Sequence, residues 1–191
     1  MLRMFVVRPG STSWDEERRI KGSMDMPLTA EGQEQVDRVV ADLANVRLDA
    51  IYTGPGESSK QTAKALATPR KLKPVCLQTL MNLDQGLWEG KLVEEVRQAF
   101  PSLYKLGQEH PELVCAPGGE TVDDALLRVR EGINKVVRKR HAGNVAIVAS
   151  DPLATIVRSY LEGKAFRDLW NSECDACRFE VVEIFPELFR V

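Results

Sequence analysis

The stretch MFVVRPGSTSW, Met4–Trp14, places a short apolar run directly before a loop of small and polar residues. The run predicts a buried β-strand, Met4–Val7, that ends at Arg8. Glycine and small hydroxyl residues after a strand end are typical of a loop that holds an anion through its backbone amides. The residue between Arg8 and Gly10 is Pro9, whose side chain carries no group for chemistry. The stretch therefore predicts a binding loop without a nucleophile at its centre.

The rest of the chain alternates strand-like and helix-like patterns. Further strands are predicted at Ala50–Thr53, Val75–Leu77, Val145–Ala149 and Phe179–Ile184. Helices are predicted at Ala30–Leu43, Glu57–Ala67, Leu92–Phe100, Ser102–Glu109, Thr121–Arg140 and Pro152–Leu161. The alternation predicts an α/β fold, a three-layer sandwich with a mostly parallel sheet flanked by helices. Ligands bind such sheets at the carboxyl ends of the strands, where the loops RPGST (8–12) and SDPL (150–153) are expected.

Length and composition limit the classes of function. The 191 residues favour one domain, residues 1–191, and the formal net charge of -2 argues against nonspecific nucleic-acid binding. No apolar run approaches the roughly 18 residues needed to span a bilayer, so no membrane partner is expected. The opening MLRMFVV is too short for a signal peptide, so we expect a cytoplasmic protein.

The chain contains four cysteines: Cys76, Cys115, Cys174 and Cys177. Without an export signal they are expected to be free thiols, buried or half-buried, rather than disulfides. The pair Cys174 and Cys177 forms a lone CxxC, which is a weak signal for a metal or redox site. A zinc site would require all four thiols to converge on one ion, so we expect no metal and no cofactor.

Six blocks of sequence, read in order, resemble the histidine phosphatase superfamily, whose fold is phosphoglycerate mutase-like. The blocks are VVRPGSTSWD (6–15), GSMDMPLTAEGQEQ (22–35), IYTGPGESSKQTAKALA (51–67), LMNLDQGLWEG (80–90), PGGETVDDALLRV (117–129) and VAIVASDPLATIVRSYL (145–161). One block alone would be a weak signal, but six in register cover nearly the whole chain. The resemblance implies a phosphoglycerate mutase-like fold, and it leaves open a monomer or a homodimer.

The departures from the family pattern fall on the residues that carry its chemistry. The resemblance implies a pocket with a phosphorylated histidine, two arginines, an acid/base glutamate and a second histidine. Of these groups Arg8 remains. Pro9 stands where the phosphorylated histidine is expected, Ser58 at the second arginine, Asn82 at the glutamate and Asp151 at the second histidine.

These changes predict a loss of phosphoryl-transfer chemistry. Loss of a nucleophile alone typically costs on the order of 10⁵–10⁶ in rate, and the two histidines of the chain, His110 and His141, are predicted at its polar periphery. We expect Asp151 to pair with Arg8 across neighbouring strand ends. A carboxylate ~4 Å from a phosphate charge costs ~4 kcal/mol at an effective dielectric of 20, so a neutral or zwitterionic ligand is favoured over phosphate.

Two hypotheses of function follow. The first is a pseudoenzyme that binds a small molecule or a protein partner, with Arg8, Gly10, Ser11, Thr12 and Asp151 as its ligand-binding residues and no catalytic residue. The second is an active phosphatase or mutase on small phosphate esters, which uses a rearranged site with Arg8 and Asp151. Carboxylates near the aligned blocks could help such a site: Glu57 and Asp84. The three tryptophans are expected to be packing residues: Trp14, Trp88 and Trp170.

Overall fold

The computed structural model describes residues 1–164 and 177–189. Its centre is a five-stranded sheet in the order β3-β2-β4-β1-β5. The strands are β1 Leu2–Val7, β2 Ala50–Thr53, β3 Val75–Cys76, β4 Gly143–Val148 and β5 Phe179–Ile184. All neighbouring pairs are parallel except β1 and β5, which are antiparallel. The predicted mostly parallel sheet is therefore confirmed. The predicted bounds of β2 and β5 match the observed ones, and those of β1, β3 and β4 differ by one or two residues.

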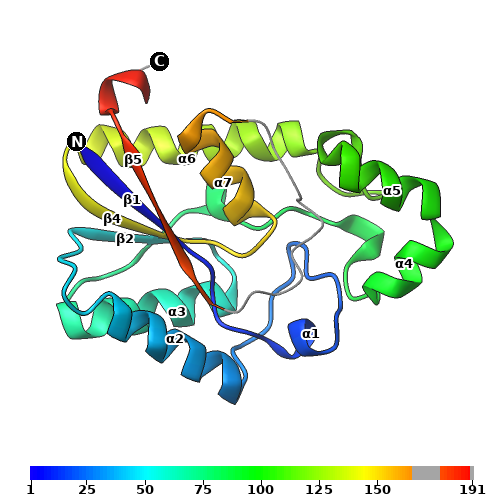
Figure 1. Ribbon diagram of the computed structural model, residues 1–191, viewed down its shortest axis with the longest axis horizontal. Helices are drawn as coiled ribbons and strands as arrows, with labels where there is room; N and C mark the ends of the chain where they lie inside the picture. The colour runs from blue at the N-terminus through cyan, green and yellow to red at the C-terminus, as the bar shows by residue number, and fades with distance from the viewer. Residues whose placement is uncertain (165–176, 190–191) are drawn as a thin grey trace.

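Helices cover both faces of the sheet (Figure 1). The α-helices are α1 Ser13–Glu16, α2 Ala30–Asp42, α3 Glu57–Ala67, α4 Val93–Ala99, α5 Pro101–Glu109, α6 Val122–Lys139 and α7 Leu153–Glu162. Short 3₁₀ helices lie at Thr68–Arg70, Gln78–Leu80, Gly86–Trp88, Pro111–Leu113 and Pro186–Phe189. Helices α2 and α3 lie on one face and α6 and α7 on the other, so the predicted sandwich of helices around a sheet is confirmed.

The alternation of side chains along β1 explains the two layers of core. Met4 and Val6 are buried in the cluster that includes residues of α6 and α7, whereas Phe5 and Val7 are buried in the cluster with α2 and α3. Each fully buried side chain of this size contributes about 1.5–3 kcal/mol relative to exposure, so both faces of the sheet favour covering helices. This explains why the strands read as continuous apolar runs.

Side-chain caps fix the starts of two long helices. The Thr121 hydroxyl accepts a hydrogen bond from the backbone amide of Asp124 at 3.1 Å at the start of α6. Thr29 caps α2 in the same way, with its hydroxyl 3.1 Å from the amide of Gly32. Such caps stabilise a helix by about 1 kcal/mol each.

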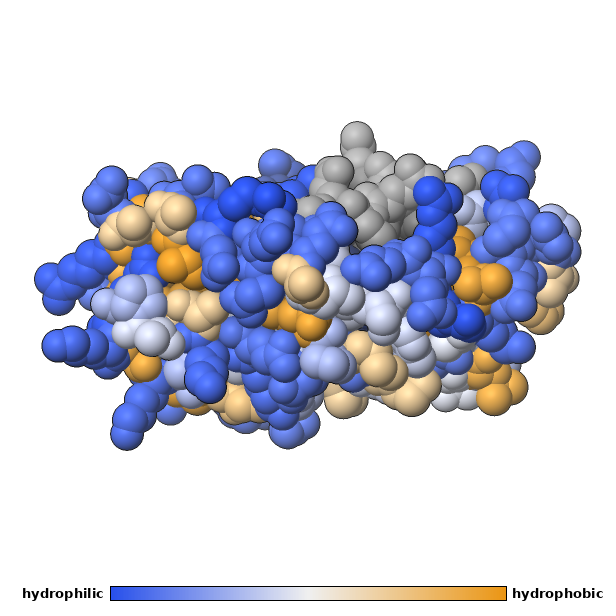
Figure 2. Space-filling view, turned by 90° about the horizontal axis from the view of Figure 1, so that it is seen from below, coloured by the Kyte–Doolittle hydropathy of each residue, from blue (hydrophilic) through white to orange (hydrophobic). Residues whose placement is uncertain are grey.

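The helices α4 and α5 lie beside the sheet rather than on one of its faces (Figure 1). They enclose a small core of their own, in which Trp88, Val96, Val114 and Ala116 are buried. The space-filling view of the underside is mostly hydrophilic, with hydrophobic residues in separate small groups (Figure 2). No helix within residues 1–164 or 177–189 is both long and apolar enough to cross a lipid bilayer.

Candidate functional site

A pocket of about 620 Å³ opens at the carboxyl ends of β1 and β4. Its floor is made by the loops that follow these two strands, and its walls come from the segment around α1 and from α4 and α5. The floor residues are Arg8, Pro9, Gly10, Ser11, Ser150, Asp151 and Pro152. The two loops that the sequence placed at the ligand-binding edge therefore meet in space.

Arg8 is held by the protein itself. The side chain is only 7% exposed, and its Nε donates a hydrogen bond to the Asp151 carboxylate. Its Nη1 donates to Glu180 Oε1 at 2.9 Å, and its Nη2 donates to Thr155 Oγ1 at 3.2 Å. The predicted pairing of Arg8 with Asp151 is confirmed. Because a second carboxylate joins the pair, these three charged groups carry a net charge of -1 rather than zero.

Glu180 is the residue of the site that sequence reasoning missed. It lies on β5 opposite Val6 of β1, which brings it beside Arg8. Its other oxygen accepts a hydrogen bond from Arg158 Nη1 at 2.5 Å. Burial acts to raise the pKa of Glu180, but the hydrogen bond from Arg158 and the charge of Arg8 outweigh it, so that its pKa lies below the ordinary value of 4.5. Glu180 is therefore charged at neutral pH and holds Arg8 together with Asp151.

The backbone amides of the loop after β1 do not form an open anion cradle. The expectation was that the amides of Gly10, Ser11 and Thr12 would face a ligand, but each donates to a side chain of the protein. The acceptors are Thr62 Oγ1 at 3.4 Å, Gln35 Oε1 at 2.9 Å and Asp15 Oδ2 at 2.7 Å, respectively. Helices α1, α2 and α3 thus occupy the donors that an anion would need.

Close packing fixes this loop against the start of α2. A Cβ atom added at Gly10 would lie 2.2 Å from the carbonyl oxygen of Gly32, and one added at Gly32 would lie 2.1 Å from that of Ser11. Both distances are far inside van der Waals contact, so only glycine fits at either position. The loop is therefore a rigid wall of the pocket.

Ser58 binds the carboxylate of Asp25, and Asn82 binds two backbone groups. The Ser58 amide and hydroxyl both donate to Asp25 Oδ2, at 3.0 and 2.6 Å. Asn82 Nδ2 donates to the carbonyl oxygen of Asp151 at 2.9 Å, while its Oδ1 accepts from the amide of Leu153 at 3.2 Å. Asn82 therefore fixes the loop that carries Asp151. Arg8, Pro9 and Asp151 line the pocket, whereas Ser58 and Asn82 do not.

The other titratable candidates lie away from the floor. Glu57 is exposed and accepts a hydrogen bond from Gln61, and Asp84 accepts one from the amide of Gly86 at 2.7 Å. Both histidines, His110 and His141, are exposed, as the sequence predicted. Within the described residues none of these four groups lines the pocket.

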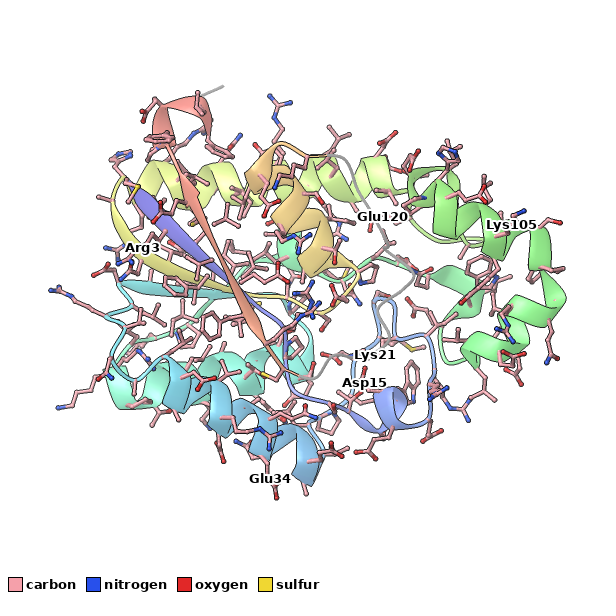
Figure 3. The ribbon with its side chains drawn as sticks, in the orientation of Figure 1. Arg3, Asp15, Lys21, Glu34, Lys105 and Glu120 are labelled. Carbon is pink, nitrogen blue, oxygen red and sulfur yellow. The ribbon has the colours of Figure 1, made fainter. Side chains whose placement is uncertain are left out.

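A second ion pair closes the wall beside the floor. Lys21 Nζ lies 2.8 Å from Asp15 Oδ1, and the two side chains are only 14% and 15% exposed. Figure 3 labels both side chains, Asp15 on α1 and Lys21 in the segment that follows it. The spacing of Thr12 and Asp15 matches a capping box, a signal in the sequence that could have located Asp15. Lys21, like Arg8, is therefore neutralised within the protein.

The cysteines differ from expectation. Cys76 and Cys115 are exposed rather than buried, and Cys174 lies outside the described residues, as does Trp170. Cys177 is half-buried and donates to the carbonyl oxygen of Arg8 at 3.0 Å, and burial raises the pKa of its thiol to about 12. Among residues 1–164 and 177–189 no group of three or more histidine, cysteine or acidic side chains is placed to hold a metal ion.

Comparison with known proteins places this geometry in a family. The family model of the histidine phosphatase superfamily (branch 1) matches residues 4–191. Phosphoserine phosphatase 1 from Hydrogenobacter thermophilus is 28% identical over 186 residues, which cover 96% of this chain and 87% of that protein. A probable phosphoglycerate mutase GpmB from Yersinia enterocolitica is 29% identical over 154 residues, covering 81% and 71%.

A solved structure agrees with this match. Bacillus stearothermophilus YhfR superposes with a TM-score of 0.85 at 26% identity, covering 96% of this chain and 92% of that structure. The predicted phosphoglycerate mutase-like fold is thereby confirmed. From the match along residues 4–191, the chain belongs to the histidine phosphatase superfamily (branch 1).

Proposed function

We propose that this chain is a catalytically impaired member of its family, a pseudoenzyme that works by binding a ligand or a partner. The observation that carries the proposal is the set of contacts around Arg8, each of whose three side-chain nitrogens donates to a protein oxygen. A phosphate at the floor would have to displace Asp151 and Glu180 from Arg8 or lie beside them. Either arrangement costs several kcal/mol, because like charges are brought together in a poorly solvated place.

The site also lacks the side-chain groups that covalent phosphoryl transfer requires. Such a route needs a nucleophile at the floor, and Pro9 supplies none. General acid–base catalysis needs a titratable group, and the Asn82 amide at the aligned glutamate position is not one. The Asn82 amide also has both its polar atoms engaged with backbone groups.

The relatives favour a second candidate, an active enzyme. Their names, phosphoserine phosphatase and probable phosphoglycerate mutase, describe work on small phosphate esters. In this chain such an activity would have to use Arg8 and Asp151, because these are the charged groups at the pocket floor.

A turnover assay separates the two candidates. The purified chain and the Hydrogenobacter phosphatase, as positive control, are incubated with p-nitrophenyl phosphate and with phosphoserine, and phosphate release is measured. The proposal predicts turnover on the order of 10⁵ below that of the control, with no further loss in Asp151→Ala. Turnover near the control that disappears in Asp151→Ala would establish the rearranged active site instead.

A further inference from the structure

Above its floor, the pocket is lined by both apolar and charged side chains. The apolar ones come from α1 and the segment that follows it, from the 3₁₀ helix Gly86–Trp88, and from α4 and α5. Six of them are Trp14, Ile20, Trp88, Val93, Val96 and Leu103. A pocket of about 620 Å³ with such a lining falls in the range of sites that bind small organic molecules.

The cations that line the pocket differ in what they contact. Arg8 and Lys21, near the floor, are paired with carboxylates as described above. Higher on the wall, Arg19 pairs with Glu17 and Arg97 pairs with Glu94, at 2.6 and 2.9 Å. Arg18 is exposed and lines the pocket, and within the described residues it has no ion pair. Arg178, which also lines the pocket, lies 3.8 Å from Glu180. Of these cations, Arg18 is therefore the one best placed to meet the charge of a bound molecule.

The backbone places Arg18 at the C-terminal end of α1. Its φ angle of 56° lies in the left-handed region, as is common for the residue after a helix, and the amide of Arg19 donates to the carbonyl oxygen of Trp14 at 2.8 Å. The Arg18 amide donates to the carbonyl oxygen of Asp15 at 3.1 Å, and its own carbonyl oxygen accepts from the amide of Val93 at 3.0 Å. The pocket rim is thus tied to the start of α4 with Arg18 at a fixed position.

We infer that this pocket binds an amphipathic organic anion, with its apolar body among the side chains of α4, α5 and Trp14 and its carboxylate beside Arg18. The ligand is oriented the opposite way from a phosphatase substrate: its negative group lies at the rim of the pocket, and the floor receives no phosphate. The inference rests on the proposed function in this one respect, that the floor does not take a phosphoryl group. Charge complementarity favours an anion, because Arg18 lies beside a partly apolar pocket whose floor cations are already paired with carboxylates.

Two probes with the same ring system test the charge requirement. Binding of 2-naphthoate, of the neutral 2-naphthamide and of inorganic phosphate to the full chain is measured by isothermal titration calorimetry. The carboxylate should bind about fivefold more tightly than the amide, as expected for one exposed charge pair. Inorganic phosphate should produce no binding heat.

Substitutions locate the binding. Arg18→Gly should bring naphthoate down to the affinity of naphthamide, and it should fold well because glycine suits the positive φ angle. Lys71→Gly is the matched control, since Lys71 also has a positive φ, 53°, but lies outside the pocket lining. Trp14→Ala should weaken both probes about tenfold by removing apolar contact, whereas Trp14→Phe should retain most of the affinity.

Any one of three results would overturn the inference. It fails if naphthoate and naphthamide bind equally well to the unchanged chain, if neither binds, or if Arg18→Gly keeps the preference for the carboxylate. Each of these outcomes leaves the pseudoenzyme proposal standing, because that proposal is decided by phosphate release. Turnover of phosphate esters, in contrast, would refute the pseudoenzyme proposal. The charge preference at the rim would still be decided by the naphthoate and naphthamide titrations.

Discussion

Replacing Arg8 by methionine removes the positive charge between two carboxylates while keeping an apolar stem of similar length. Arg8 Nη1 lies 2.9 Å from Glu180, and its Nε contacts Asp151. Without the guanidinium, these two partly buried acids face one another with no cation between them. We expect Arg8→Met to destabilise the protein.

The magnitude follows from burial and from the partners that remain. Breaking a buried ion pair by removing one partner typically costs 3–5 kcal/mol. Here the Asp151 and Glu180 side chains are 18% and 25% exposed, and Glu180 keeps Arg158 at 2.5 Å. The loss should therefore lie at the lower end, about 3 kcal/mol. For a chain of this length each kcal/mol lowers Tm by about 2–4 °C, so Tm should fall by about 6–12 °C.

Urea unfolding followed by tryptophan fluorescence measures the change directly, provided that the m-value is unchanged. Arg3→Met is the matched control on the same strand, because Arg3 donates to the neutral side chain of Asn144, at 2.8 Å. The control should change the free energy of unfolding by about 1 kcal/mol or less. If Arg8 were instead an unpaired cation in an open anion site, its removal should raise the free energy of unfolding, because it would relieve strain that is kept for function. Equal or greater stability of Arg8→Met would refute the reasoning.

Three further predictions concern single groups of the site. The pKa of Glu180 is depressed in the folded state, so its contribution to stability is present above pH 4.5 and lost as the pH falls through the lowered pKa. The free energy of unfolding of Glu180→Gln should therefore change less with pH in this acid range than that of the unchanged chain, and parallel curves for the two proteins would contradict this. Asn82→Ala should cost about 1–3 kcal/mol in urea unfolding, because two backbone groups lose their partner; a neutral change would show that the bridge is dispensable. With a thiol pKa of about 12, Cys177 should react with iodoacetamide at pH 8 much more slowly than the exposed Cys76 and Cys115, as peptide mass spectrometry will show; equal rates would contradict its burial.

The fold was largely predictable because its signals are local. Apolar runs such as that of β4 and the 3.6-residue pattern of α6 specify a strand and a helix without knowledge of their neighbours. Six blocks in family order then fixed how these elements pack. The ends of elements were less predictable, because backbone pairing extends beyond the apolar run, as at Leu2 in β1 and Gly143 in β4.

The pairing of Arg8 with Asp151 was predictable because both follow parallel neighbouring strands. The role of Glu180 was not predictable, because the residues FEVVEI do not specify that β5 pairs antiparallel with β1 or the register of that pairing. The same difficulty applies to the loop amides. The sequence identifies donors at residues 10–12 but gives no measure of whether a ligand or a side chain of α1, α2 or α3 accepts their hydrogen bonds.

Arg8 is neutralised by the protein and is therefore not available to phosphate. Thermal unfolding in increasing inorganic phosphate tests this with the unchanged chain and with the double variant Asp151→Asn, Glu180→Gln, because a ligand that binds the folded state raises Tm. We expect no phosphate-dependent rise in Tm for the unchanged chain and a clear rise for the double variant, in which Arg8 is free of both carboxylates. An equal rise in the two proteins would contradict it.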